Sequence, residues 1–302
     1  MVDVPDASQP VDWLVYGAAH DAGVTFRPGA RFGPRAIREA SQYLKQYHLE
    51  HRVDVPGVLS LADAGDAPVQ PYLLQQTLSE VASFAAALPP AAKLLALGGD
   101  HSIAYANMKA TRQRLGERCP PEGMALVHFD SHLDTVDAVW GERFGHASVF
   151  IRAIEEKIID PSRMISIGIK GPLNTPSDLD YAQRHGVTLV TGEQHRSGAG
   201  RAAIEAFLAR TATHPTYLTF DIDVVDPAFA PGTGTPCPGG MSSAEALAAV
   251  RQFAGVNLVG GDVVEVLPDR DVSGITAFLA AHVAFEILAI DALRAQRERH
   301  PA

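Results

Sequence analysis

The sequence predicts an α/β protein in which a mostly parallel central sheet carries helices on both faces. Short apolar runs alternate along the chain with longer segments of helical periodicity. Parallel strands need long crossover connections, usually helices, so this alternation favours a parallel sheet over hairpins. Polar clusters also follow several of the apolar runs directly, and ligands of such sheets bind beyond the carboxyl ends of the strands.

The expected elements follow one another in a regular order. Each expected strand is a short, mainly apolar run that ends at a turn or at polar residues. The strands are expected at residues 12–17, 58–63, 93–99, 124–130, 163–169, 187–191, 216–221 and 257–266. The helices are expected at residues 34–46, 72–87, 102–115, 148–157, 177–185, 200–210, 242–253 and 273–297. Because no repeat or low-complexity linker interrupts this order, residues 1–302 are predicted to form a single domain, with residues 1–10 flexible.

The composition favours a cytoplasmic enzyme or binding protein. The chain has 302 residues, of which 46% are hydrophobic, and its net charge of −10 argues against a nucleic-acid partner. Cys119 and Cys237 cannot build a disulfide framework and suit a reducing cytosol. The start "MVDVPDASQP" lacks the features of a signal peptide, and no segment shows the ~20 apolar residues that span a bilayer. We therefore expect no membrane partner.

Four of the expected strands end in polar clusters. The clusters are "GGDHS" (98–102), "HFDSHLD" (128–134), "FDIDVVD" (220–226) and "DVVEV" (262–266). Residues i, i+2 and i+4 of an extended segment face the same way, so the alternating side chains of the second and third clusters share a side. The side chains expected to converge at one edge of the sheet are His101, Asp130, His132, Asp134, Asp221 and Asp223.

This set of side chains predicts two metal ions. Carboxylates with a minority of His suit Mn²⁺ and similar ions, and six ligands exceed the three or four of a zinc site. They suit two ions about 3.5–4 Å apart, with Asp130 and Asp221 as the expected bridges. The ions would also explain why Asp221 and Asp223 lie together at the end of a buried strand, where like charges repel. A single D-x-D motif is also typical of a turn or cap, but three clusters at separate strand ends favour the metals.

The motifs resemble those of a known family. "GGDHS", "DSHLD" and "TFDIDVVDPAFAPGTGTP" are similar to the signatures of the ureohydrolases, the arginases and agmatinases, and favour the agmatinase-like branch. "GARFGPRAIREAS" (29–41) and "DVVEVLPDRD" (262–271) extend the likeness to almost the whole chain. The resemblance implies a three-layer α/β/α domain of the arginase/deacetylase type, a binuclear manganese centre with Ni²⁺ or Co²⁺ as alternatives, and a trimer or hexamer. It also implies hydrolysis of a guanidino compound to urea and an amine.

The resemblance also assigns roles to individual residues. It implies that one ion is held by His101, Asp130, Asp134 and Asp221, and the other by Asp130, His132, Asp221 and Asp223. His146 matches the family's proton-shuttle histidine and Glu265 its guanidinium-binding carboxylate, so both, with Asp134, are expected to be catalytic. The guanidino carbon is a poor electrophile, and two metals can supply a strong nucleophile from water at neutral pH. Glu265 can orient the cation, and His146 can protonate the departing amine.

Several residues depart from the family pattern. Ser131 replaces the usual Ala and is expected to face away from the metals, as a change of packing. Ala147 and Val149 replace Gly and Pro beside His146. Leu267 and Val136 stand where relatives carry polar residues, and the missing hydrogen-bonding partner argues against arginine. The remaining substrates are agmatine, guanidinobutyrate, guanidinopropionate, guanidine itself or a biguanide.

The entrance of the predicted site is expected to contain residues 20–23, 135–144, 171–176 and 237–240. Asp137 is predicted to attract an amine tail, which would place agmatine slightly ahead, and Trp140 to stack on a planar cation. His20 is the third distinctive side chain there. Each of these residues also fits the description of an ordinary loop residue.

Two alternative functions are also considered for this sequence. A deacetylase-like amidohydrolase with one zinc ion would share the fold, but retention of all six ligands disfavours it. A non-catalytic or regulatory partner subunit of a hetero-oligomer would also share it, yet such subunits usually lose ligands or the shuttle. The preferred interpretation is therefore a homo-oligomeric enzyme.

Overall fold

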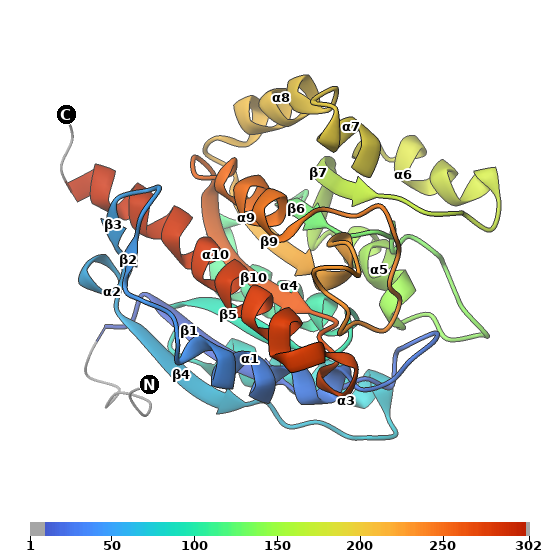
Figure 1. Ribbon diagram of the computed structural model, residues 1–302, viewed down its shortest axis with the longest axis horizontal. Helices are drawn as coiled ribbons and strands as arrows, with labels where there is room; N and C mark the ends of the chain where they lie inside the picture. Colours follow the sequence, from blue (N-terminus) through green and yellow to red (C-terminus); the bar gives the residue numbers. More distant parts are fainter. Residues whose placement is uncertain (1–9, 300–302) are drawn as a thin grey trace.

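The centre of the molecule is an eight-stranded sheet, in which every neighbouring pair of strands is parallel (Figure 1). The computed structural model describes residues 10–299. In sheet order the strands are β4 (Leu61–Asp66), β1 (Trp13–Ala18), β5 (Lys93–Gly98), β10 (Asn257–Val264), β9 (Pro215–Asp221), β6 (Met124–Phe129), β7 (Ile159–Ile169) and β8 (Thr188–Thr191). Each expected strand is present, and the prediction of a parallel sheet is confirmed.

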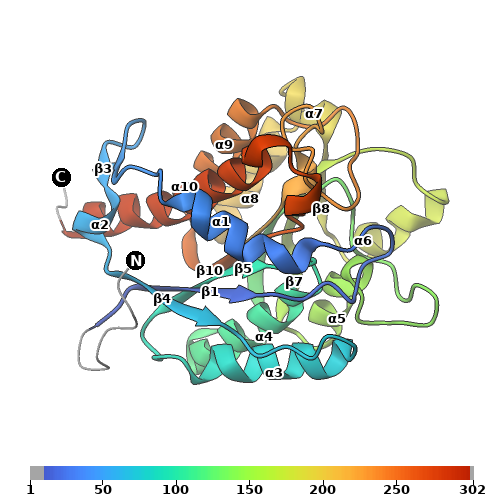
Figure 2. The same ribbon diagram turned by 60° about the horizontal axis from the view of Figure 1, so that its bottom comes forward.

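Helices cover both faces of this sheet, which gives the three-layer arrangement (Figure 2). One layer contains α1 (Gly33–Ser41), α8 (Arg201–Thr211), α9 (Ser243–Arg251) and α10 (Ile275–Arg299). The other contains α3 (Leu74–Ala87), α4 (Ile103–Leu115) and α5 (Val149–Glu155). Short helices α2 (Val55–Val58), α6 (Asp180–Arg184) and α7 (Gly192–Arg196) lie in the connections.

The central strands are buried on both faces. All residues of β6 and β9 are buried, as expected for a parallel sheet between two helix layers. One apolar core lies on each side: Phe129, Phe220 and Phe253 belong to the core under α9 and α10, and Phe150 belongs to the other. This double core fixes the strand ends that carry the polar clusters.

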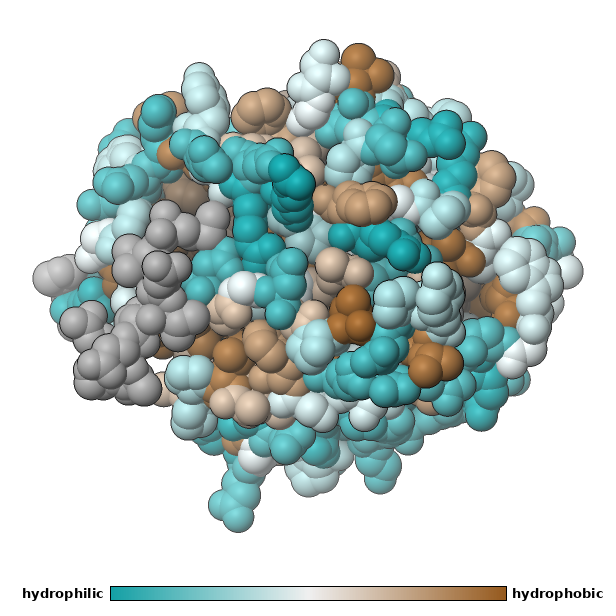
Figure 3. All heavy atoms as spheres, turned by 90° about the horizontal axis from the view of Figure 1, so that it is seen from below, coloured by the Kyte–Doolittle hydropathy of each residue, from teal (hydrophilic) through white to brown (hydrophobic). Residues whose placement is uncertain are grey.

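The edge strand β4 is protected by charge. The guanidinium of Arg38 on α1 pairs with Asp63 at 2.7 Å and with Asp66 at 2.6 Å. Charges of this kind prevent an edge from pairing with another chain. Strand β4 lies at the bottom of Figure 1. On the face of the molecule seen from below, hydrophobic side chains lie in small groups among hydrophilic ones (Figure 3).

Local patterns did not predict the hairpin between α1 and α2. Strands β2 (Tyr47–His48) and β3 (Val53–Asp54) are antiparallel and too short to carry a periodic signal. Their position depends on a contact distant in sequence, because Nε2 of His48 lies 2.8 Å from Glu286 on α10. Helix α1 also ends at Ser41, before the predicted end at residue 46.

By its length and composition, helix α10 could cross a membrane, although the sequence was expected to contain no such segment. However, 67% of its most apolar window is buried within the protein, as in a core helix. The flexibility predicted for residues 1–10 and the assessment of a signal peptide lie, apart from residue 10, outside the described residues.

Candidate metal centre and active site

Four neighbouring strands, β5, β10, β9 and β6, end at the same edge of the sheet and carry the predicted ligands. His101 follows β5, Glu265 follows β10, Asp221 ends β9 and Asp130 follows β6. Close backbone packing holds the turn after β5, because a Cβ at Gly99 would lie 2.1 Å from the carbonyl oxygen of His20. The four strand ends therefore meet as the sequence predicted.

The first group of ligands converges on Nδ1 of His101. The Oδ2 atoms of Asp134, Asp130 and Asp221 lie 2.9, 3.1 and 3.3 Å from this nitrogen. All four side chains are buried or nearly so. The structure therefore brings together the four side chains that are predicted to hold one ion.

The tautomer of His101 leaves Nδ1 free for a metal. Its Nε2 lies 2.9 Å from the hydroxyl of Thr219, and that hydroxyl donates its one hydrogen to Asp262. The hydroxyl must therefore accept from Nε2–H, so a neutral His101 has its lone pair on Nδ1, facing the carboxylates. Burial lowers the pKa of His101, but Asp130, Asp134 and Asp221 outweigh it and raise that pKa well above its usual value, and a bound metal ion would take the place of that proton. Nδ1 is buried and has no hydrogen-bond partner, which fits a metal ligand.

The second group of ligands surrounds Nδ1 of His132. Oδ2 of Asp223 lies 3.1 Å and Oδ1 of Asp130 lies 3.3 Å from that nitrogen. Asp130 thus turns one oxygen to each group, and its Oδ1 also accepts the N–H of His132 at 2.6 Å, so its bridging role stays a prediction. Oδ1 of Asp221 accepts the N–H of Asp223 at 2.8 Å, so only Oδ2 of Asp221 faces the first group. The bridging role of Asp221 stays a prediction.

The protonation behaviour of the cluster indicates a need for positive charge. Burial, Asp223 and Asp130 raise the pKa of Asp221 well above its usual value. Burial also raises the pKa of Asp130, but contacts with three histidines outweigh it and hold that pKa well below its usual range. Two divalent ions would supply the charge for which these carboxylates compete.

The backbone is held in an unfavourable conformation at two of the functional residues. Asp134 has φ 51° and Glu265 has φ 65°, in the left-handed region that non-glycine residues rarely adopt. Hydrogen bonds hold both, from the N–H of Phe150 to the carbonyl of Asp134 and from the N–H of Glu265 to the carbonyl of Gly99. Strain of this kind is characteristic of functional sites.

The sequence interpretation missed His128, which supports the bridging carboxylate. Its Nε2 lies 2.9 Å from Oδ2 of Asp130, and its Nδ1 lies 3.0 Å from the hydroxyl of Ser166. A signal was present, because His128 shares the two-residue spacing of Asp130 and His132. Asp262 was also missed, but for a different reason: its contact with Thr219 depends on the pairing between β9 and β10.

His146 and Glu265 form a buried pair beside the metal ligands. Nδ1 of His146 lies 2.8 Å from Oε1 of Glu265, which also accepts the N–H of His101 at 2.9 Å. Burial lowers the pKa of His146, but Glu265 outweighs burial and raises that pKa to about 9. Burial raises the pKa of Glu265. Oε2 of Glu265 is buried and has no partner, so it is free to accept hydrogen bonds from a ligand.

A cavity of about 670 Å³ opens above these groups. His132, Asp134, Asp221 and His146 are among the residues that line it. Residues 25–27, 170–174 and 235–237 and several residues of the range 133–139 form its other walls. Three of the four predicted entrance segments therefore contribute to the lining.

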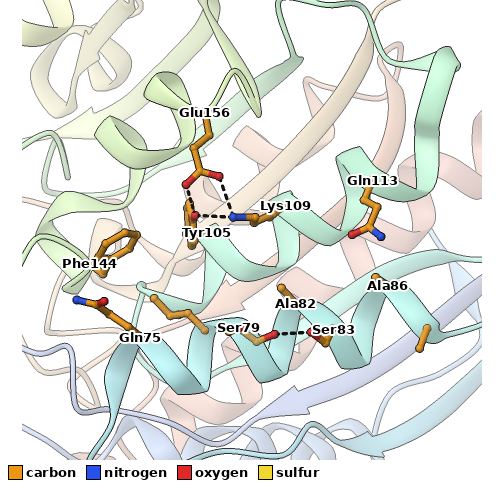
Figure 4. A pocket seen from close by; sticks show the side chains of 12 residues that line it. Gln75, Ser79, Ala82, Ser83, Ala86, Tyr105, Lys109, Gln113, Phe144 and Glu156 are labelled. Atoms are coloured by element: carbon orange, nitrogen blue, oxygen red, sulfur yellow. Dashed lines mark hydrogen bonds and ion pairs between the residues drawn. The ribbon is translucent and has the colours of Figure 1, made fainter.

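A second hollow, of about 680 Å³, lies between α3 and α4 (Figure 4). There Glu156 accepts hydrogen bonds from Tyr105 and from Lys109, the latter at 2.8 Å. The hollow contains none of the predicted metal ligands. The cavity at the carboxyl edge of the sheet is therefore the candidate active site.

Some predicted entrance residues lie elsewhere. Asp137 is exposed and pairs with Arg152 and with Arg143, the latter at 3.3 Å, and it does not line the cavity. Trp140 is 85% exposed and also lies outside the lining. His20 is buried behind the site, where its carbonyl accepts the N–H of Asp100. Thus the structure gives no support to the proposed roles of Asp137 and Trp140, because Arg152 already neutralises Asp137 and Trp140 faces solvent.

The departures from the family pattern also have definite positions. Val136 and Ala147 line the cavity as expected, whereas Leu267 is fully buried and does not reach it. Ser131 does more than alter packing, because its hydroxyl donates to the carbonyl of Asp223 at 2.7 Å and accepts from Lys170. Ser131 thereby connects two loops at the metal centre.

The fold and the site place the chain among the three-layer α/β/α proteins with a candidate metal centre at the carboxyl edge of a parallel sheet. The chain matches the model of the arginase family over residues 11–289. Proclavaminate amidinohydrolase from Streptomyces clavuligerus is 40% identical over 94% of this chain and 90% of that protein. A solved structure of the same relative has a TM-score of 0.87, with 39% identity over 94% of this chain and 92% of that chain.

Two further relatives have different names. Guanidinopropionase from Pseudomonas aeruginosa is 40% identical over 93% of this chain and 87% of that protein. A structure titled a hypothetical agmatinase from Burkholderia thailandensis has a TM-score of 0.85, with 37% identity over 98% of this chain and 90% of that chain. The chain belongs to the arginase family of ureohydrolases, whose members hydrolyse C–N bonds of amidino and guanidino compounds.

Proposed function

We propose that this chain hydrolyses a guanidino compound other than arginine to urea and an amine, and that it uses two Mn²⁺ ions. The observation that carries the proposal is the unpartnered Oε2 of Glu265, which is buried beside His146 and the two groups of metal ligands. A guanidinium can offer paired N–H donors to such an oxygen. When bound, the two ions would acidify water so that it can attack the guanidino carbon at neutral pH.

Glu265 would orient the substrate. Its Oε1 is fixed by His146 and by the N–H of His101, so the carboxylate has little freedom to rotate. Its Oε2 then presents an acceptor at a defined place, which favours one orientation of the guanidinium over the ligand groups. The raised pKa of Glu265 follows from burial, and a cationic substrate would favour its charged form.

His146 is equipped to hold and release a proton. Its Nε2 lies 3.0 Å from the N–H and 2.8 Å from the hydroxyl of Thr25. Thr25 thus offers a donor to the neutral ring and an acceptor to the protonated ring. With a pKa of about 9, His146 is protonated at neutral pH and can give its proton to the departing amine.

The walls of the cavity argue against arginine. Val136, Val139 and Leu173 line it and offer apolar side chains to the tail of a substrate. Beside these side chains the α-amino group of arginine would lose water without gaining enough hydrogen bonds. Guanidinobutyrate, guanidinopropionate, agmatine and small substituted guanidines remain as the candidate substrates.

A urea-release assay over a panel of guanidino compounds tests the proposal. The purified chain is reconstituted separately with Mn²⁺, Ni²⁺, Co²⁺ and Zn²⁺, and bound metal is counted in each preparation. Urea release with two ions per chain is expected, most rapid with Mn²⁺. Release of acetate from an acetylated amine with one zinc ion would favour the deacetylase-like alternative, and two bound ions without any turnover would favour a regulatory subunit.

A further inference from the structure

Arg27 places an uncompensated positive charge on the wall of the active-site cavity. It is partly buried among the lining residues, and its guanidinium lies 4.7 Å from the ring centre of Phe26. Within residues 10–299, this guanidinium has no hydrogen-bonding or ion-pair partner. A guanidinium is the side chain best suited to bind a carboxylate through two parallel hydrogen bonds.

The backbone of Arg27 lies close to the carboxylate that would hold the guanidino group. Gly234 separates them: a Cβ at this position would lie 3.0 Å from the carbonyl oxygen of Arg27 and 3.6 Å from Oε2 of Glu265. Because Arg27 also lines the cavity, a substrate with its guanidino group on Glu265 would extend its tail along the wall to which Arg27 belongs.

The loop that carries Arg27 is fixed at several points. The carboxylate of Asp21 accepts the N–H of Gly29 at 2.7 Å and pairs with the guanidinium of Arg31. Between these residues, Thr25 contacts Nε2 of His146 through its N–H and its hydroxyl. These contacts give Arg27 a defined position before a substrate arrives, which lowers the entropy cost of binding.

The other charged residues of the cavity wall already have partners. Nζ of Lys170 donates to Ser131 and to the carbonyl oxygens of Asp223 and Val224, at 2.9 and 3.2 Å for the carbonyls. The carboxylate of Asp178 accepts the N–H of Asn174 at 2.8 Å, among other bonds that cap a short helix. Arg27 is thus the charge left to meet the tail of a substrate, and it would repel an amine.

We propose that Arg27 binds a carboxylate on the tail of the substrate, so that this chain acts on guanidino acids in preference to guanidino amines. This proposal rests on the proposed function, because it names the substrate class of the same site. It differs from the sequence expectation, in which Asp137 placed agmatine ahead.

Two substrates of closely similar length test it. Guanidinobutyrate ends in a carboxylate and agmatine in an amine, so they differ mainly in the charge of the tail. The unaltered enzyme should show a kcat/KM for guanidinobutyrate at least ~10-fold above that for agmatine, the order expected from a charge-assisted pair. Arg27→Gln should lower kcat/KM for guanidinobutyrate about 10–100-fold, mainly through KM, and change that for agmatine less than about twofold. Arg27→Lys should retain part of the preference because it keeps the charge but loses the paired geometry.

Arg201→Gln is the matched control, because Arg201 lies on α8, 82% exposed in its side chain and outside the cavity. It should leave both substrates within about twofold of the unaltered enzyme. An equal loss for both substrates in Arg27→Gln, or a preference of the unaltered enzyme for agmatine, would overturn the role of Arg27 while urea release still upholds the proposed function. Absence of urea from every guanidino compound would overturn the proposed function itself.

Discussion

The carboxylate of Glu265 holds Nδ1 of His146 at 2.8 Å through one oxygen and leaves the other oxygen buried without a partner. One residue therefore serves two purposes: it fixes the orientation of a histidine and offers an acceptor to a cation. Because Glu265 follows β10 and His146 lies in a loop after β6, neither purpose is visible within a single segment of the chain. Their pairing is a consequence of the strand order.

Asp130, the predicted bridging carboxylate, should control metal content. Asp130 turns Oδ2 toward His101 and Oδ1 toward His132, so Asp130→Asn should weaken both ion sites together. We expect two divalent ions per chain in the active enzyme and fewer than one in the variant, with urea release reduced to background. Metal counting after gel filtration checks this, with Glu205→Gln on the surface of α8 as the control. One tightly bound ion in a fully active enzyme would contradict the binuclear interpretation.

Removal of the shuttle should separate chemistry from metal binding. His146 contacts Glu265 and Thr25 but is not within either ligand group, so His146→Ala should keep both ions. The value of kcat should fall roughly 10²–10⁴-fold, the usual effect of losing a general acid. Small amines or imidazole added to the assay should restore part of the rate. Unchanged turnover would remove His146 from the mechanism.

The pair of Asp21 and Arg31 should make the stability of the loop that carries Arg27 depend on pH. Burial raises the pKa of Asp21, but hydrogen bonds from Arg31 and from the N–H of Gly29 outweigh it, and the pKa lies below its usual value. A carboxyl with a lowered pKa stabilises the folded state above its unfolded pKa of about 3.9, and this contribution is lost as the pH falls through the folded pKa.

Asp21→Asn should therefore lower the free energy of unfolding at neutral pH by about 1–3 kcal/mol, the cost of losing charge-assisted hydrogen bonds at a buried carboxylate whose partner Arg31 is partly exposed. Below about pH 4 the difference between variant and parent should shrink. Chemical denaturation of both proteins at neutral and acidic pH measures this. A difference that stays constant across the range would show that Asp21 acts by packing and not by charge.

Much of the fold and of the ligand set could be predicted because both are local in sequence. Buried parallel strands give apolar runs, and the ligands follow these runs at fixed spacing, as in Asp130, His132 and Asp134. What could not be predicted depends on contacts between distant segments. The neutralisation of Asp137 by Arg152 requires the fold of the loop before α5, and the burial of Leu267 requires packing against the glycine-rich loop after β9. Such contacts decide which side chains reach the cavity, and no local pattern encodes them.

Arginine should be a poor substrate even though its guanidino group fits the site. Its tail carries an ammonium as well as a carboxylate, and the wall beside the tail contains the apolar side chain of Val136. Arg27 could attract the carboxylate but would repel the adjacent ammonium, for which the apolar wall offers no acceptor. We therefore expect kcat/KM for arginine at least ~10²-fold below that for guanidinobutyrate, the order expected when a charged group enters a site without a partner. Val136→Asn should narrow this gap by raising the arginine value while leaving guanidinobutyrate within about threefold, since one amide supplies a single hydrogen-bonding partner. Steady-state kinetics with both substrates on both proteins checks the prediction, and arginine as the better substrate of the unaltered enzyme would show that the cavity wall, though not the metal centre, has been misinterpreted.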